Sequence, residues 1–405
     1  MIRKWLTGFV GVAALVVGSL VMSAPAGAAI DTVTPVPSPN AGTSSDSLNS
    51  VSCVTTSWCI AVGASGRDSG DETLIESWDG TSWSIVESPS VSGIGGQLRS
   101  VSCLSISWCV AVGTSDTGSG ASTLVATWDG TSWSVVHEYQ STPGSSIDGL
   151  DSVSCASTAW CVAVGATDTG SAFEMLIETW NGSSWSVAAS PVASAPQHQL
   201  HSVSCVSLSS CTAVGLAFED SPVQTLVVSW DGSVWSIVES PNASTSTDHL
   251  DGISCVSASF CVAVGSTWSD TGPGSLIESW DGNAWSIAET PNPGTSLLKS
   301  VSCVSSSSCV AVGFSATSSV TDVLVMVWDG STWSVLPNPT AGETGERLLS
   351  ATCVSESWCV GVGSTSGSSE TLVLALTGPE PEPEPGPTTT TTTMPTDQVI
   401  PVYAG

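Results

Sequence analysis

Short apolar segments, separated by polar and glycine-rich turns, recur along most of the chain. One unit spans 48–89 and contains four such segments, at 48–53, 59–63, 73–78 and 83–86. Their residues are small, β-branched or aromatic, and none of the segments has the 3.6-residue period of an amphipathic helix. Asp79-Gly80 joins the last two segments and is typical of a tight hairpin turn. The pattern therefore predicts four short antiparallel strands in each unit.

The unit repeats seven times, and a pair of cysteines marks each copy. The first cysteines of the pairs fall at 53, 103, 155, 205, 255, 303 and 353, so the spacings are 50, 52, 50, 50, 48 and 50 residues. A repeat of roughly 40–50 residues that holds four strands is typical of a β-propeller blade.

The two ends of the array indicate how it closes. The seventh repeat stops after its third strand, at 371–376, and residues 33–53 align without a gap on 235–255. Residues 33–36 therefore take the place of a fourth strand, where the prolines at 35 and 37 suit an outermost position. Completing the last blade in this way would remove two exposed sheet edges. We expect an all-β fold over 33–377: a seven-bladed β-propeller of four-stranded antiparallel blades, closed by the N-terminal strand.

The repeated residues follow the pattern Ser-Cys…Cys-x-Ala-Val-Gly…Trp-Asp-Gly-x-x-Trp. This layout resembles kelch and WD-repeat propellers, and its turn is similar to the Asp-box of sialidase-type propellers, although one residue shorter. Over 33–376 the chain looks most like cysteine-paired propeller repeats of secreted actinobacterial proteins. The resemblance implies the fold. No activity is assigned to that group, so it implies no function.

All fourteen cysteines belong to Cys-x5-Cys pairs that bracket the loop between the first and second strands. A zinc site needs about four ligands close together, and each pair belongs to a different blade. We therefore predict seven structural disulfides: Cys53–Cys59, Cys103–Cys109, Cys155–Cys161, Cys205–Cys211, Cys255–Cys261, Cys303–Cys309 and Cys353–Cys359.

Six tryptophan pairs flank the hairpin turns, as in Trp78 and Trp83. Rows of aromatic rings can bind sugars, but the same placement in six repeats favours packing between blades, because large rings fill the space that widens away from the axis.

The two ends of the sequence differ in composition from the repeats. Residues 1–28 contain a basic start, an apolar run and Ala26-Gly27-Ala28, and predict a cleaved signal peptide. The tail at 378–405 alternates Glu and Pro and then has six threonines, a composition typical of a disordered stalk. We expect a secreted monomer, associated with the cell surface through this tail, and no transmembrane span in the mature chain.

Charge narrows the choice of partner. Without Arg3 and Lys4, four basic side chains face 36 acidic ones, a net charge of −32. Such a surface repels phosphate backbones, so we expect no nucleic-acid partner.

One position varies while its neighbours repeat. It follows a leucine of the first strand, and in a propeller it would lie near the mouth of the central channel. Six repeats place a polar or charged residue there, and the seventh has Leu349. We predict that these six side chains bind a ligand: Asn49, Arg99, Asp151, His201, Asp251 and Lys299. A solvated rim position that drifts freely would give the same pattern.

Two functions follow from this row. The first is a non-catalytic binding or scaffold module that holds a glycan, a peptide or a protein. The alternative is a propeller-type glycan hydrolase or lyase, with Asp151, His201 and Asp251 as acid/base groups. We predict no cofactor and no metal site, and we expect His198 and His249 to be solvated loop residues.

Overall fold

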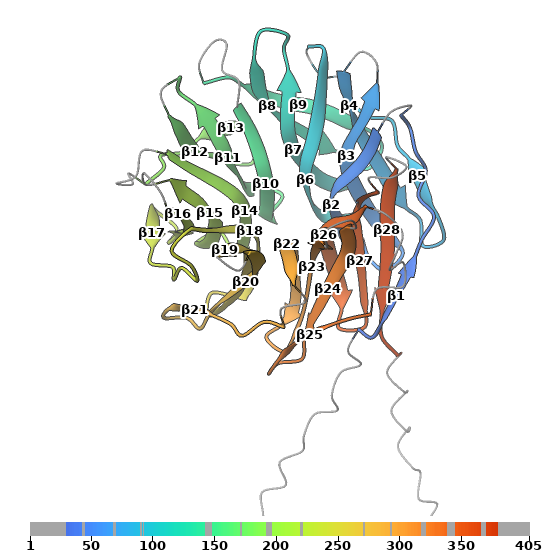
Figure 1. Cartoon of the computed structure of the whole chain (residues 1–405). Helices are drawn as coiled ribbons and strands as arrows, with labels where there is room; N and C mark the ends of the chain where they lie inside the picture. The colour runs from blue at the N-terminus through green and yellow to red at the C-terminus, as the bar shows by residue number, and fades with distance from the viewer. Residues whose placement is uncertain are drawn as a thin grey trace, which may run out of the picture.

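The computed structural model describes residues 30–379, except for 43–44, 68–69, 90, 92, 142–147, 171, 192–196, 219–221, 270–271, 292–293, 317–320, 338–344 and 366–369. Every regular element in these ranges is a β-strand, and the strands form twisted sheets around a common centre (Figure 1). None of the described residues forms a helix with the length and apolar character needed to cross a bilayer. The predicted signal peptide and most of the predicted tail lie outside the described residues.

Each repeat contributes strands in a fixed order. The first strands, which lie towards the centre in Figure 1, are β2 (Ser45–Thr55), β6 (Gly95–Ser105), β10 (Asp148–Ser157), β14 (Gln197–Ser207), β18 (Thr247–Ser257), β22 (Thr295–Ser305) and β26 (Glu346–Ser355). The second strands are β3 (Trp58–Arg67), β7 (Trp108–Asp116), β11 (Trp160–Asp168), β15 (Ser210–Phe218), β19 (Phe260–Ser269), β23 (Ser308–Ala316) and β27 (Trp358–Thr365).

The outer half of each sheet is shorter. The third strands are β4 (Gly70–Trp78), β8 (Ala121–Trp128), β12 (Phe173–Trp180), β16 (Val223–Trp230), β20 (Gly272–Trp280), β24 (Thr321–Trp328) and β28 (Thr371–Thr377). The fourth strands are β5 (Trp83–Ile85), β9 (Trp133–Tyr139), β13 (Trp185–Val187), β17 (Trp235–Val238), β21 (Trp285–Ile287) and β25 (Trp333–Val335), with β1 (Thr32–Pro35) in the same position beside β28.

Hydrogen bonds join these strands into six sheets, five with four strands and one with eight. The eight-stranded sheet consists of two antiparallel four-stranded units, which meet through a single parallel pair, Val223 with Thr247. The fourth sheet position of the last repeat is taken by β1, which pairs antiparallel with β28 from Thr32 opposite Thr377 to Pro35 opposite Leu374. The prediction of four antiparallel strands per repeat is confirmed.

All seven predicted disulfides are present, and each joins cysteines that lie opposite one another in the first and second strands. The bridged Cα atoms are 4.0–4.1 Å apart. The bridges therefore fasten each repeat within itself and do not join neighbouring repeats.

The apolar cores lie between neighbouring sheets. One core contains Val162 and Ile177 from the third repeat together with Leu200 and Trp235 from the fourth. In every tryptophan pair the second ring is only 6–8 % exposed, and the two ring centroids are 5.6–6.0 Å apart. The first indole N–H donates to a backbone carbonyl of the cysteine loop, as Trp230 does to Leu208 at 3.1 Å. The tryptophan pairs thus pack the interfaces between sheets, as the sequence predicts.

Candidate functional site

The seven residues of the variable row share one backbone feature, a β-bulge in the first strand. Where β2 pairs with β3, Leu48 lies opposite Gly63 and Ser50 lies opposite Val62, so no residue of β3 lies opposite Asn49. The same register shift follows the leucine in the other six repeats. A bulge bends its strand and re-aims the extra side chain. The variable residue is therefore the one that leaves the regular ladder.

The glycine that ends each Cys-x-Ala-Val-Gly segment makes the bulge possible. A Cβ atom on Gly63 would lie 1.8 Å from the carbonyl oxygen of Ser47. The equivalent glycines of the other six repeats would place a Cβ 1.9–2.0 Å from the matching carbonyl oxygen. Any side chain at this position would push the first strand away, so the glycine is a steric requirement of the bulge.

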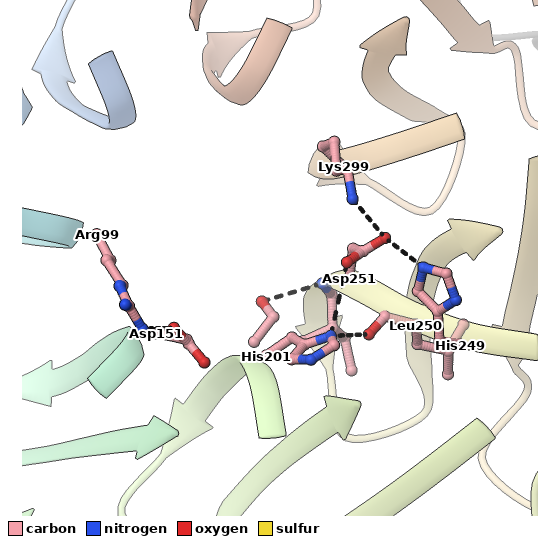
Figure 2. A network of polar contacts seen from close by, with 9 residues as sticks. Arg99, Asp151, His201, His249, Leu250, Asp251 and Lys299 are labelled. Atoms are coloured by element: carbon pink, nitrogen blue, oxygen red, sulfur yellow. Dashed lines mark hydrogen bonds and ion pairs between the residues drawn. The ribbon is translucent and has the colours of Figure 1, made fainter. Parts of the chain in front are cut away.

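Three of the predicted residues connect the first three repeats. The amide nitrogen of Asn49 donates to the carbonyl oxygen of Leu98 in the next first strand, at 2.8 Å. The guanidinium of Arg99 donates to a carboxylate oxygen of Asp151, one repeat further on, at 2.6 Å (Figure 2). Both members of this ion pair are partly exposed, at 32 % and 27 % of the side chain, so both are accessible to solvent.

Asp251 is the centre of a second, more buried group, which we call the Asp251 cluster (Figure 2). Its Oδ1 lies 3.5 Å from Nδ1 of His201, and its Oδ2 lies 3.3 Å from Nε2 of His249 and 3.2 Å from Nζ of Lys299. Nδ1 of His201 also lies 3.1 Å from the carbonyl oxygen of Leu250. Three successive repeats therefore supply one carboxylate and three nitrogen groups to a single point.

Electrostatics reinforces this arrangement. Burial alone would raise the pKa of Asp251, but hydrogen bonds from His201 and His249 and the charge of Lys299 hold it far below its usual range. Burial opposes protonation of His201, yet its hydrogen bond to Asp251 and the charges of Asp251 and Asp151 raise the pKa of His201 above its usual value. The cluster thus stabilises an ionised carboxylate beside a histidine that protonates readily.

Gly252 brings the fifth and sixth repeats together at the cluster. All six other repeats have serine at this position. A Cβ on Gly252 would lie 2.9 Å from the carbonyl oxygen of Lys299 and 2.9 Å from the Cα atom of Ser300. Because no side chain separates the two strands there, Lys299 lies within reach of Asp251.

The serines of the Ser-x-Ser-Cys segments link the first strands of neighbouring repeats. Ser100 Oγ accepts a hydrogen bond from the backbone N–H of Val153 at 3.1 Å, and Ser102 Oγ accepts one from Cys155 at 3.3 Å. Equivalent bonds follow at other repeats, including one from Val51 N–H to Ser350 Oγ at 3.4 Å. Sequence reasoning missed this role. Its signal was the serine recurring two and four residues after the leucine.

The structure brings the predicted residues together in part. Arg99 and Asp151 form one pair, while His201, Asp251 and Lys299 form the other group with His249. The expectation that His198 and His249 are solvated loop residues is wrong. Both lie within first strands, with His198 6 % exposed and the His249 side chain 17 % exposed.

The described residues around the Asp251 cluster do not form a set of metal ligands. Among the residues that the structure describes, no group of three or more His, Cys, Asp and Glu side chains is arranged to hold an ion. The bulge residues instead present charged hydrogen-bonding groups whose positions are fixed by contacts with their neighbours.

Comparisons with known proteins inform the fold. No family model and no curated protein matches the chain. Among solved structures it is similar to YCF48 bound to a D1 peptide (13 % identity, 88 % of this chain and 100 % of that chain, TM-score 0.54). It is also similar to YCF48 from Cyanidioschyzon merolae (13 % identity, 85 % of this chain and 98 % of that chain, TM-score 0.52). A third similar structure is an ulvan polysaccharide lyase (8 % identity, 71 % of this chain and 80 % of that chain, TM-score 0.49). Together with the repeated four-stranded sheets and paired cysteines, the YCF48 likeness identifies the fold as a disulfide-containing β-propeller.

Proposed function

We propose that the seven repeats form one closed ring, with β1 as the fourth strand of the last blade. The pairing of β1 with β28 supports closure, and so does the bond between Val51 of the first repeat and Ser350 of the last. Core packing agrees, because Leu48 and Val51 share an apolar cluster with Val360 and Val373.

A repeated set of hydrogen bonds from the segment after each fourth strand, which we call the latch, gives further support. In the last blade, Asn40 Oδ1 accepts the N–H of Thr371 at 2.9 Å, and Ser38 Oγ donates to Glu76 in the first blade at 2.7 Å. In the fourth and fifth repeats, which are continuous in the chain, the same bonds join Asn242 to Thr225 at 3.0 Å and Ser240 to Glu278 at 2.7 Å. The N-terminal segment thus makes the contacts that a continuous blade connection makes elsewhere.

We further propose that the protein is an exported, non-catalytic binding module whose ligand docks on the rim formed by the bulge residues. The observation that carries this proposal is the Asp251 cluster, in which a carboxylate is already held by three nitrogen groups. Such a carboxylate is a fixed recognition group and a weak base, because its proton affinity is suppressed. Seven disulfides suit an oxidising compartment. Export through residues 1–28 and display on the tail at 378–405 remain predictions.

The test compares the wild-type protein with rim variants on defined peptide and oligosaccharide arrays. We expect Arg99→Ala and Asp251→Asn each to weaken binding about tenfold or more, since each removes a charged group from the rim. Glu239→Gln, an exposed change remote from the rim, serves as the matched control. Binding that is equally strong in all four proteins would reject the rim as the site.

A glycan hydrolase or lyase is the second candidate, because the contact between His201 and Asp251 and the raised pKa of His201 are features of an acid/base pair. Release of reducing ends or unsaturated sugars from a polysaccharide panel, lost in His201→Ala, would establish this activity. Binding of a polysaccharide without its cleavage would instead support the non-catalytic binding module.

A further inference from the structure

Three cavities on the first, second and last repeats join into one groove. The inner cavity, of about 300 Å³, is lined by residues of all three repeats, among them Ser47, Gln97, Asp71, Ser364 and Arg347. A middle cavity of about 220 Å³ shares Asp71 and Gln97 with it, and an outer cavity of about 300 Å³ shares Ile94 and Gly95 with the middle one. The groove therefore runs outwards from the first strands β2, β6 and β26, between β4 and the start of β6. Cavities of this size hold small ligands or side chains.

Glycines of the second repeat create the groove. Gly96 stands two residues before the leucine, where four other repeats carry an acidic residue and the remaining two carry His198 and Ser296. A Cβ on the adjacent Gly95 would lie 2.5 Å from the carbonyl oxygen of Asp71. Gly95 therefore lets the start of β6 approach the backbone of Asp71, and Gly96 leaves without a side chain a position that is acidic in four other repeats, so the groove is a departure of this repeat from their pattern.

The lining has an ordered chemistry. At the inner end Arg347 is exposed, and its Nε donates to Ser364 Oγ at 3.1 Å. No carboxylate oxygen of the described residues lies within 4.0 Å of this guanidinium. Further out, the lining contains the carboxylates of Asp71, Asp116 and Glu72 and the 63 % exposed side chain of Ile94. The inner cavity thus carries one basic group, Arg347, together with the carboxylates of Asp46 and Asp71, and the outer lining carries only acidic, polar and apolar groups.

We propose that this groove binds an extended peptide that carries basic and β-branched side chains, with an acidic side chain at the end that meets Arg347. Lysine or arginine side chains pair with Asp71 and Asp116, and apolar side chains cover Ile94. The whole protein has 36 acidic against 6 basic residues, so its field attracts a basic peptide. This site goes beyond the rim function and uses no residue of the Asp251 cluster.

The lining favours a peptide over an oligosaccharide. The apolar face of a sugar ring packs best on a flat aromatic ring, and the described lining residues of the three cavities include none. Their apolar groups are instead aliphatic and sit between carboxylates, which suits side chains that alternate along an extended backbone.

The experiment measures fluorescence anisotropy of labelled octapeptides with the purified, oxidised protein. The main probe alternates lysine and valine and carries one glutamate, placed at either end in two versions. Matched probes replace every lysine by glutamate or by serine, and labelled chitosan hexaose tests a basic glycan. We expect the lysine probe to bind at least tenfold more tightly than the other peptides and to weaken with added salt.

Groove variants decide the assignment. Asp71→Asn/Asp116→Asn should weaken the lysine probe at least tenfold, and Ile94→Ser should weaken it severalfold. We expect the wild type to prefer the version of the lysine probe whose glutamate meets Arg347, and Arg347→Glu should reverse this preference between the two versions. Glu239→Gln and Asp251→Asn should leave binding unchanged.

Peptide binding that ignores the groove variants but is lost in Asp251→Asn would overturn the groove while supporting the rim. Binding of chitosan hexaose without binding of the peptide would overturn the peptide assignment, and so would the absence of binding by every probe.

Discussion

Single residues without side chains decide the geometry of the rim. Gly63 and its six equivalents let the first strand bulge, and Gly252 lets the fifth and sixth repeats approach at the Asp251 cluster. The charged residues at the rim are therefore positioned by a backbone feature that the glycines permit, and replacing the glycines should disturb the site without touching a polar group.

Two glycines of β27 separate this effect from a general intolerance of change. Gly363→Ala should lower the free energy of unfolding by about 2–3 kcal/mol, because its Cβ would lie 1.9 Å from a backbone carbonyl oxygen. Gly361 occupies the place of an alanine in the other six repeats, and its Cβ would meet the end of the Leu348 side chain at 3.0 Å. Gly361→Ala should change stability by less than about 1 kcal/mol. Urea unfolding measures both, and equal effects would refute the role of the bulge.

The ionisation of His201 reports on the Asp251 cluster. Asp251→Asn removes the hydrogen bond and the charge that raise the pKa of His201, and burial, which lowers it, remains. We expect the pKa of His201 to lie above its usual value in the wild type and to fall in the variant. NMR titration of the imidazole protons measures this change. An unchanged pKa would show that the two side chains do not interact in solution.

At the scale of elements, each blade is a four-stranded sheet fastened near one end by its disulfide. Removing a bridge should leave the folded structure unchanged. It should act mainly by raising the conformational entropy of the unfolded chain.

Cys205→Ser/Cys211→Ser should therefore cost about 2 kcal/mol of unfolding free energy, the chain-entropy value for so short a loop. Ser209→Ala, an exposed change in the same loop, should cost less than about 0.5 kcal/mol. Denaturant unfolding compares the two variants, and a bridge variant as stable as the control would argue that the bridges are not structural.

Much of this element structure could be predicted from the sequence, because period and turn residues are local signals. The four strands per repeat, the seven bridges and the placement of 33–36 beside the last repeat all follow from the repeated pattern, and β1 at Thr32–Pro35 lies one residue from that expectation. The bulge could not be predicted, since an extra residue leaves no mark on an apolar pattern that is already irregular. The sequence also left open which members of the row touch, because that depends on the approach of separate blades, as at Gly252.

At the scale of the whole molecule, buried carboxylates couple stability to pH. Burial raises the pKa of Glu76 and of Glu278 to about 7, and the charges of Asp46 and Asp248 add to this effect against the hydrogen bonds from Ser38 and Ser240. Both glutamates accept a hydrogen bond from a serine at the boundary between neighbouring repeats, so their protonation affects contacts between repeats.

The folded state holds these two protons more tightly than the unfolded chain, where the glutamate pKa is about 4.3. Stability should therefore fall as pH rises from about 4.5 to about 7 and then level off, with a loss of about 3 kcal/mol for each glutamate. His137, whose pKa is raised by its hydrogen bond to Glu178, adds a loss in the same direction above pH 6.5. Glu76→Gln/Glu278→Gln should flatten the dependence and be the more stable protein at pH 8. Thermal unfolding between pH 5 and 8 checks this, and an unchanged slope would contradict it.

Closure of the ring by the N-terminal strand is the central claim, because the rim exists only if all seven first strands surround one channel. Amide hydrogen exchange of residues 31–36 tests it most directly. Asp31 N–H donates to the Thr377 carbonyl at 3.1 Å and Val36 N–H to the Val373 carbonyl at 2.9 Å. We expect these amides to exchange at least a hundredfold more slowly than an unstructured peptide and about as slowly as those of Trp235–Val238, the equivalent strand within the chain. Exchange of residues 31–36 at the rate of an unstructured peptide, with Trp235–Val238 protected, would contradict the closed ring.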